Sequence, residues 1–338
     1  MNANSNNNPW IARWLGLIAA MIFAMVVVGG ATRLTGSGLS ITEWKPIVGT
    51  IPPLNTADWQ DAFEKYKLSS QYKLQNQGIS LADFQFIFWW EWAHRLLGRL
   101  VGFVFAVPFL WFAVRRQLPS GLWSKLLVLF LLGGAQGALG WYMVASGLVD
   151  RVSVSQYRLA AHLTLASFLF AAVLWTMFSL KTIVSGRNSL IALVLPFLIL
   201  LQIAAGAFVA GLDAGQGYNT WPLMDGQIVP QGLGAMNPSW INLFENAMTV
   251  QFDHRLLAYS ILALAIFHFW RVRSSSSALL VIAIFAQASL GVFTLLWHVP
   301  LALALMHQAG AMVVLLAAVW NANNHTARTE DLTRSHAL

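Results

Sequence analysis

Apolar residues fall into eight runs along the chain, each long enough to cross a bilayer as a helix. About 20 apolar residues span the hydrocarbon core. The predicted spans are residues 10–31, 91–114, 122–145, 157–181, 190–211, 254–271, 277–297 and 300–321. We therefore predict an all-α, polytopic membrane protein with eight transmembrane helices. Between the first two spans lies a long polar loop, in which residues 56–72 predict an amphipathic helix on the membrane surface.

The two halves of the chain repeat each other. Three residues return at one constant offset: Gly29, Gly38 and Trp44 as Gly206, Gly215 and Trp221. Residues 91–98 return as 251–258, and the Ala-Gln and Leu-Gly pairs at 135–140 return at 286–291. An even number of spans per repeat gives both halves the same orientation, as in repeats related by an axis along the membrane normal. We predict two pseudo-twofold-related four-helix bundles, residues 1–185 and 186–338.

Composition and charge agree with a membrane protein. The chain is 57% hydrophobic and only 10% charged, whereas soluble domains carry about a quarter charged residues. The net charge of +7 comes from Lys and Arg in loops, which indicates topology rather than nucleic-acid binding. The short basic loops predict that both termini are cytoplasmic, and residues 212–253 have no Lys or Arg and are predicted outside. The absence of Cys excludes disulfides, iron–sulfur clusters and thiolate metal sites.

Four histidines fall at matching places in the two halves: His94, His162, His254 and His307. A single histidine in a span is more often a packing or proton-path residue. Four in register with a duplication favour metal ligation instead. In each half they lie on the second and fourth helices, so two imidazoles could ligate one haem iron axially inside a bundle. His268 follows His254 on the same helix by about 21 Å, so we expect it at the interface, outside that site.

Glu91 lies three residues before His94, so both project to similar sides of a helix. It could exchange protons with a substrate, or it could cap a helix N-terminus, where negative charge is favoured. Gln251 stands at the equivalent place and cannot titrate. A structural residue would not need to differ between halves, so we interpret Glu91 as catalytic. Arg95 and Arg255 each follow a candidate ligand and could pair with haem propionates.

These residues resemble a known family. The Glu-x-x-His-Arg phrase at 91–95, the Gly-Gly-Ala-Thr-Arg-Leu-Thr-Gly-Ser-Gly-Leu-Ser run at 29–40 and the Thr-Glu-Trp-Lys-Pro at 42–46 are similar to those of haem A synthases. The resemblance covers nearly the whole chain. It is strongest to the proteobacterial and mitochondrial branch, which keeps the long first loop. Some relatives carry a cysteine pair in that loop, and this chain has none, which excludes a thiol relay.

The resemblance implies an oxidoreductase of the bacterial inner (cell) membrane. It would oxidise the C8 methyl of haem o to a formyl group, making haem a for cytochrome oxidase. The substrate haem would bind at His94 and His162, and haem b at His254 and His307. Glu91 would be the essential acid, and electrons would pass to the second haem. The enzyme that makes haem o is a hypothetical partner, and the sequence does not identify the electron acceptor.

A di-haem b-type membrane electron carrier is the alternative. Such a carrier would share the four histidines but would not need Glu91 to differ from Gln251. A proton-coupled transporter is a second alternative. It is disfavoured because the paired histidines lie near one face of the membrane and do not form a chain across it.

Overall fold

The computed structural model describes residues 9–45, 48–149, 151–180 and 189–326. Within these residues, eight helices are long and apolar enough to cross a membrane. They are α1 (Pro9–Leu34), α4 (Leu81–Val114), α5 (Leu122–Gly147), α6 (Gln156–Ser179), α7 (Leu190–Gly211), α9 (Ala247–Val272), α10 (Ser275–Leu296) and α11 (Leu301–Asn324). The described part has no β-strand, only one isolated bridge between Met224 and Gln227. The all-α prediction and its eight spans are confirmed.

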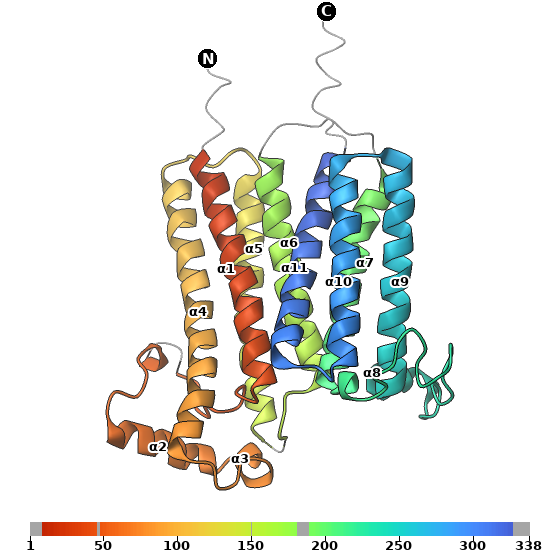
Figure 1. Cartoon of the computed structure of the whole chain (residues 1–338). Coiled ribbons are helices and arrows are strands. Elements are labelled where there is room, and N and C mark those ends of the chain that lie inside the picture. The colour runs from red at the N-terminus through yellow and green to blue at the C-terminus, as the bar shows by residue number, and fades with distance from the viewer. Residues whose placement is uncertain (1–8, 46–47, 150, 181–188, 327–338) are drawn as a thin grey trace, which may run out of the picture.

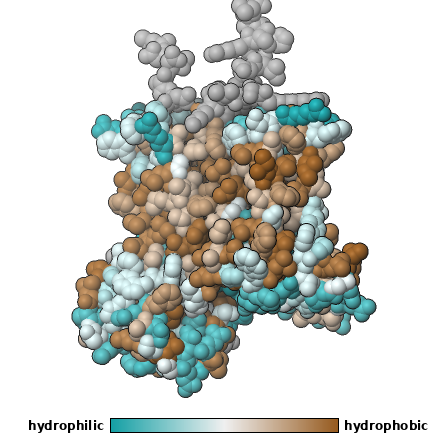
Figure 2. All heavy atoms as spheres, viewed as in Figure 1, coloured by the Kyte–Doolittle hydropathy of each residue, from teal (hydrophilic) through white to brown (hydrophobic). Residues whose placement is uncertain are grey.

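The long helices stand side by side, and a band of hydrophobic residues crosses the middle of the molecule between polar ends (Figures 1 and 2). One end carries the short helices α2 (Thr56–Lys67), α3 (Ser70–Leu74) and α8 (Asn242–Glu245), and we call it the loop end. Short 3₁₀ turns lie at Val48–Thr50, Ala214–Gln216 and Ser239–Ile241. α1 begins and α11 ends at the opposite end (Figure 1), as an even number of spans requires.

The long helices form two rings of contacts. In the first, α1 and α5 each contact α4 and α6. In the second, α7 and α10 each contact α9 and α11. α6 packs on α7, and α11 packs on α1 and α6, which joins the two rings. The predicted domain boundary between residues 185 and 186 lies outside the described residues, and the pseudo-twofold axis stays a prediction.

Two helices begin earlier than the apolar pattern predicts. α4 starts at Leu81 rather than at residue 91, because Ser80 and Asp83 form a reciprocal capping box. α9 starts at Ala247 rather than at residue 254, where the Asn246 side chain accepts hydrogen bonds from the first turn. The caps, not the first apolar residue, determine where these helices begin. α4 has 34 residues, about 51 Å of helix, so its first turns extend beyond the hydrocarbon core.

The segment predicted as one amphipathic helix at 56–72 forms two helices, α2 and α3. The chain breaks between them at Ser69, whose hydroxyl caps α3. The apolar residues of α2 pack against the projecting turns of α4. Phe84 is fully buried and stacks on Phe63 and Tyr66, with ring centroids 5.0 and 5.2 Å away. Trp59 lies edge-on to Phe88 at 4.9 Å. This aromatic cluster fixes the long first loop to α4.

Replacing Phe84 by Ala should release this loop. Removing a buried phenyl ring costs about 3–5 kcal/mol, so amide hydrogens of α2 should exchange faster while those of α1 stay protected. Phe86→Ala is the matched control, since Phe86 is two residues away and 57% exposed. Hydrogen exchange read by mass spectrometry distinguishes the two variants. Equal exchange in both would contradict the proposed anchoring.

Candidate functional site

The four predicted histidines lie on α4, α6, α9 and α11, and each side chain is half-buried. His162 and His307 are both the seventh residue of their helices, close to the loop end. His94 interacts electrostatically with His162, and His254 with His307. The structure thus brings the histidines together in two pairs, one in each ring of helices.

Each imidazole lies against a glycine of a neighbouring helix: Gly29 faces His94, Gly140 faces His162, Gly206 faces His254 and Gly291 faces His307. A methyl group built on these glycines would lie between 2.7 Å (at Gly291) and 3.1 Å (at Gly206) from a ring atom. Carbon atoms pack at about 3.5–4.0 Å, so only glycine leaves the rings in place. Gly29 corresponds to Gly206 in the sequence repeat, and Gly140 corresponds to Gly291. Both halves therefore have the same contact between a glycine and an imidazole.

Three glutamines bond to the histidines, and the sequence analysis assigned them no role. Gln136 donates to the backbone carbonyl of His162 at 3.0 Å. Gln202 and Gln287 donate to the carbonyls of His254 and His307 at 3.0 and 2.7 Å. Their Nε2 atoms also lie 3.0 and 3.1 Å from the Nδ1 atoms of the same rings. The recurrence of Gln136 as Gln287 was visible in the sequence, but its partner was not.

Several buried polar atoms of this layer have no partner within the protein: His162 Nδ1, Arg255 Nε and the Oε1 atoms of Gln136, Gln202 and Gln287. Buried polar atoms are normally paired. The described residues contain no group of three or more His, Asp or Glu side chains that could hold a metal ion by themselves. Two imidazoles per half therefore fit an iron whose remaining ligands come from a macrocycle, and the Arg255 N–H fits an anionic substituent of that macrocycle.

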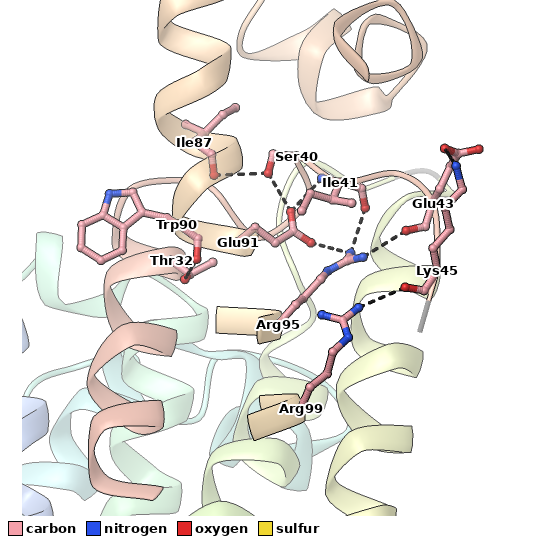
Figure 3. A network of polar contacts seen from close by, with 10 residues as sticks. All are labelled: Thr32, Ser40, Ile41, Glu43, Lys45, Ile87, Trp90, Glu91, Arg95 and Arg99. Carbon is pink, nitrogen blue, oxygen red and sulfur yellow. Dashed lines mark hydrogen bonds and ion pairs between the residues drawn. The ribbon is translucent and has the colours of Figure 1, made fainter. Parts of the chain in front are cut away.

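Glu91 sits in the interior of α4, 2% exposed, with a complete set of hydrogen bonds (Figure 3). Its Oε2 accepts from the Ser40 hydroxyl and the Ile41 N–H, both at 2.8 Å. Its Oε1 accepts from Arg95 Nη2 at 2.6 Å. Because α4 begins at Leu81, Glu91 does not cap a helix N-terminus, and that alternative is wrong. The carboxylate instead ties the loop that follows α1 to α4.

Gln251 also joins its helix to a loop, but it donates hydrogen bonds to the loop where Glu91 accepts them. It is 3% exposed and its Nε2 donates to the carbonyls of Ala214 and Gly217 at 2.7 and 2.8 Å. Its Oε1 accepts from Arg255 at 2.7 Å. The first loop offers donors and the second offers acceptors, so a carboxylate suits one and an amide the other. The expectation that a structural residue would not differ between halves is therefore wrong, and the difference alone does not identify Glu91 as catalytic.

Arg95 and Arg255 hold the loops over the candidate site. Arg95 donates to the carbonyls of Ile41 and Glu43 at 2.9 and 3.0 Å (Figure 3). Arg255 donates to those of Tyr218 and Thr220 at 2.8 and 2.9 Å. Both guanidinium groups are thus engaged by backbone carbonyls, which sequence reasoning missed. Their pairing with propionates stays a prediction, and for Arg255 the unpartnered Nε is the donor that remains.

The first loop also carries a charged cluster. Lys45 and Lys65 approach the Glu43 carboxylate to 2.9 and 3.1 Å. Their hydrogen bonds hold the pKa of Glu43 below its ordinary value. The Glu43 carboxylate therefore stays ionised to a lower pH than an ordinary glutamate, next to the backbone that Arg95 binds.

His268 is buried, with no exposed surface, and its predicted place at the membrane interface stays a prediction. Its Nδ1 lies 3.2 Å from the Ser189 hydroxyl and its Nε2 3.1 Å from Asn321 Nδ2. It occupies the end of α9 opposite to His254, so it does stand outside the candidate site. Its polar partners, one at the start of α7 and one on α11, account for its burial.

α1 connects the two halves of the site through consecutive glycines. Gly29 faces the His94 ring, and a methyl group on Gly30 would lie 2.8 Å from Nε2 of Gln308, the residue after His307. Gln308 donates to the carbonyl of Val26 at 2.6 Å. Arg33 extends the link, since it donates to the carbonyl of Ala210 and to Asp213 in the second half. α1 therefore lies against His94 of the first pair on one side and against the residue beside His307 of the second pair on the other.

Gly140→Ala should disturb one imidazole without unfolding the bundle. The added methyl would lie 2.9 Å from Cε1 of His162, so the ring must move and haem bound per protein should fall in the first half. Gly137→Ala, one turn earlier on α5, meets nothing within 4 Å and should leave the haem content unchanged. Haem-to-protein ratios of the two purified variants check this. Equal haem-to-protein ratios in the two variants would show that haem binding does not depend on the contact between Gly140 and His162.

Comparisons with known proteins identify the family of the chain. The family model described as cytochrome oxidase assembly protein (COX15-CtaA) matches residues 12–319. A heme A synthase of Parvibaculum lavamentivorans is 52% identical over 93% of this chain and 94% of its own length. One of Azorhizobium caulinodans is 55% identical over 93% of this chain and 94% of its own, and one of Brucella ovis 51% identical over 94% and 93%. The chain belongs to the haem A synthase family of cytochrome oxidase assembly proteins.

Proposed function

We propose that this protein is a haem A synthase, which oxidises the C8 methyl of haem o to a formyl group and supplies haem a to cytochrome oxidase. Two imidazole pairs packed on glycines, only one of which lies near a buried carboxylate, carry the proposal. Relatives about half identical over nearly the whole chain are named heme A synthase. The proposed location is the bacterial inner (cell) membrane, with both termini cytoplasmic and the loop end outside.

The two halves take different roles in this proposal. His94 and His162 hold the substrate haem o, and His254 and His307 hold haem b. Haem b, when bound, supplies a one-electron acceptor for the electrons removed from the substrate. Gly29 and Gly206 keep the rings of His94 and His254 close to α1 and α7. The enzyme that makes haem o is the proposed partner on the substrate side.

Glu91 is the proposed proton acceptor. With water as the oxygen donor, oxidation of a methyl group to an aldehyde releases one proton with each electron removed, and Glu91 lies one turn from His94 on α4. Its carboxylate accepts hydrogen bonds from Ser40, Ile41 and Arg95, which hold both of its oxygens in place. The single hydrogen of the Ser40 hydroxyl can point at Glu91 Oε2 (2.8 Å) or at the carbonyl of Ile87 (3.3 Å), so the hydroxyl can turn to the carbonyl when Glu91 takes up a proton.

The di-haem electron carrier stays the second candidate, because the opposite polarity of the two loops accounts for Glu91 and Gln251 without any chemistry. Extraction of the pigment from purified protein distinguishes the two. Haem o or haem a beside haem b in a pyridine haemochrome spectrum supports the synthase. Haem b alone, with no conversion of added haem o, supports the carrier.

Glu91→Gln should abolish haem a formation while both haems remain bound, because an amide cannot accept the released protons. Extracted haem from cells and from purified protein gives the measurement. The control is Ser40→Ala, which removes one donor to the carboxylate but leaves the acid in place, and it should retain haem a formation. Normal haem a production by the Glu91→Gln variant would remove Glu91 from the chemistry. Loss of bound haem in the same variant would assign Glu91 a structural role.

A further inference from the structure

We infer that His94 is the exchangeable ligand of the first site, because Met25 stands where the second half has the ligand-orienting glutamine Gln202. The inference rests on the proposed function, since it assumes haem between each imidazole pair. It explains how one half could release its haem as product while the other keeps its haem as cofactor.

Three of the four candidate ligands, His162, His254 and His307, are hydrogen-bonded to a glutamine. Gln136 bonds to the carbonyl of His162, and both its own Oε1 and the His162 Nδ1 are buried without a partner. A histidine that ligates iron through one ring nitrogen donates the N–H of the other to an acceptor, which fixes the orientation of the ring. A contact between Gln136 Oε1 and His162 Nδ1–H would satisfy both atoms at once.

The second half has two such glutamines. Gln202 approaches the Nδ1 of His254 to 3.0 Å, and Gln287 approaches that of His307 to 3.1 Å. The Oε1 atoms of both amides are buried and unpartnered. As placed, the amide N–H groups face the rings, and Gln202 Nε2 also lies 3.2 Å from Nε2 of His254. When a ring ligates iron and carries its proton on the other nitrogen, Oε1 is the amide atom that would accept this N–H, and a rotation of the amide would then orient both ligands of the second site.

Among the residues that the structure describes, no glutamine bonds to His94 as Gln202 bonds to His254. Gln202 lies four residues before Gly206, and Met25 lies four residues before Gly29, the glycine that corresponds to Gly206. The Met25 methyl would meet a Cβ on Gly98 at 3.2 Å, so the Met25 side chain lies against α4 one turn from His94. A thioether is at most a weak acceptor and donates nothing. It cannot hold the His94 ring in the way that Gln202 holds His254.

The two sites therefore differ in how many ligands are oriented: one in the first half and two in the second. Removing a hydrogen-bond partner of a metal-ligating residue costs roughly 10- to 100-fold in metal affinity. Met25 in place of a glutamine should likewise weaken the bond between His94 and the iron. His94 should leave the iron more readily than His162, His254 or His307, which suits a site that binds a substrate and releases a product.

Carbon monoxide binding to the reduced, haem-loaded protein tests the inference, because CO reaches a six-coordinate iron only after an imidazole leaves. We expect a fast and a slow phase in the unaltered protein. Met25→Gln should slow the fast phase roughly 10- to 100-fold. Gln202→Met should accelerate the slow phase by a similar factor. Stopped-flow absorbance in the Soret region gives both rates.

Gln308→Met is the matched control, because Gln308 lies in the same layer but bonds to the carbonyl of Val26 instead of a ligand. It should change neither phase. A single CO phase for both haems, or rates unaffected by both Met25→Gln and Gln202→Met, would overturn the inference. Two phases that respond as expected in a protein that makes no haem a would refute the proposed function and leave the inference standing.

Discussion

Every polar group inside an apolar slab needs a partner within the protein, and this constraint shapes the layer of histidines. Hydrocarbon offers no hydrogen bonds, so an unpaired group costs several kcal/mol. In this layer the polar side chains bond to backbone carbonyls of neighbouring segments. Gln136 reaches the carbonyl of His162, and Thr32 reaches that of Trp90 at 3.2 Å. The few buried atoms that stay unpartnered are consequently informative, because they cluster around the imidazoles.

The two rings of helices have similar sequences and contacts, and they differ at particular hydrogen bonds. Glu91 and Gln251 occupy one position but bond to loops of opposite polarity. Met25 and Gln202 occupy another, and only the second can bond to a ring. Such exchanges alter one site without changing the helix packing around it. A duplicated bundle can in this way divide two tasks between two copies of one pocket.

Hydropathy alone was sufficient to predict the eight spans, because a bilayer requires long apolar runs. It was not sufficient for the first turns of α4, which are set by the cap at Ser80. The matched histidines and glycines were visible as repeated letters. That each ring packs on one of these glycines depends on how antiparallel helices align, which a repeat does not reveal. The partners of Glu91 were also inaccessible, since Ser40 is 51 residues away in the sequence and meets it only through the fold.

The consecutive glycines of α1 have a mechanical consequence. One faces the His94 ring and the next faces Gln308, beside His307. With no side chain on either, the α1 backbone itself lies against both the His94 ring on α4 and the Gln308 amide on α11. A side chain introduced at either position would act as a wedge between α1 and the helix that it faces, displacing the His94 ring from one side or the Gln308 amide from the other.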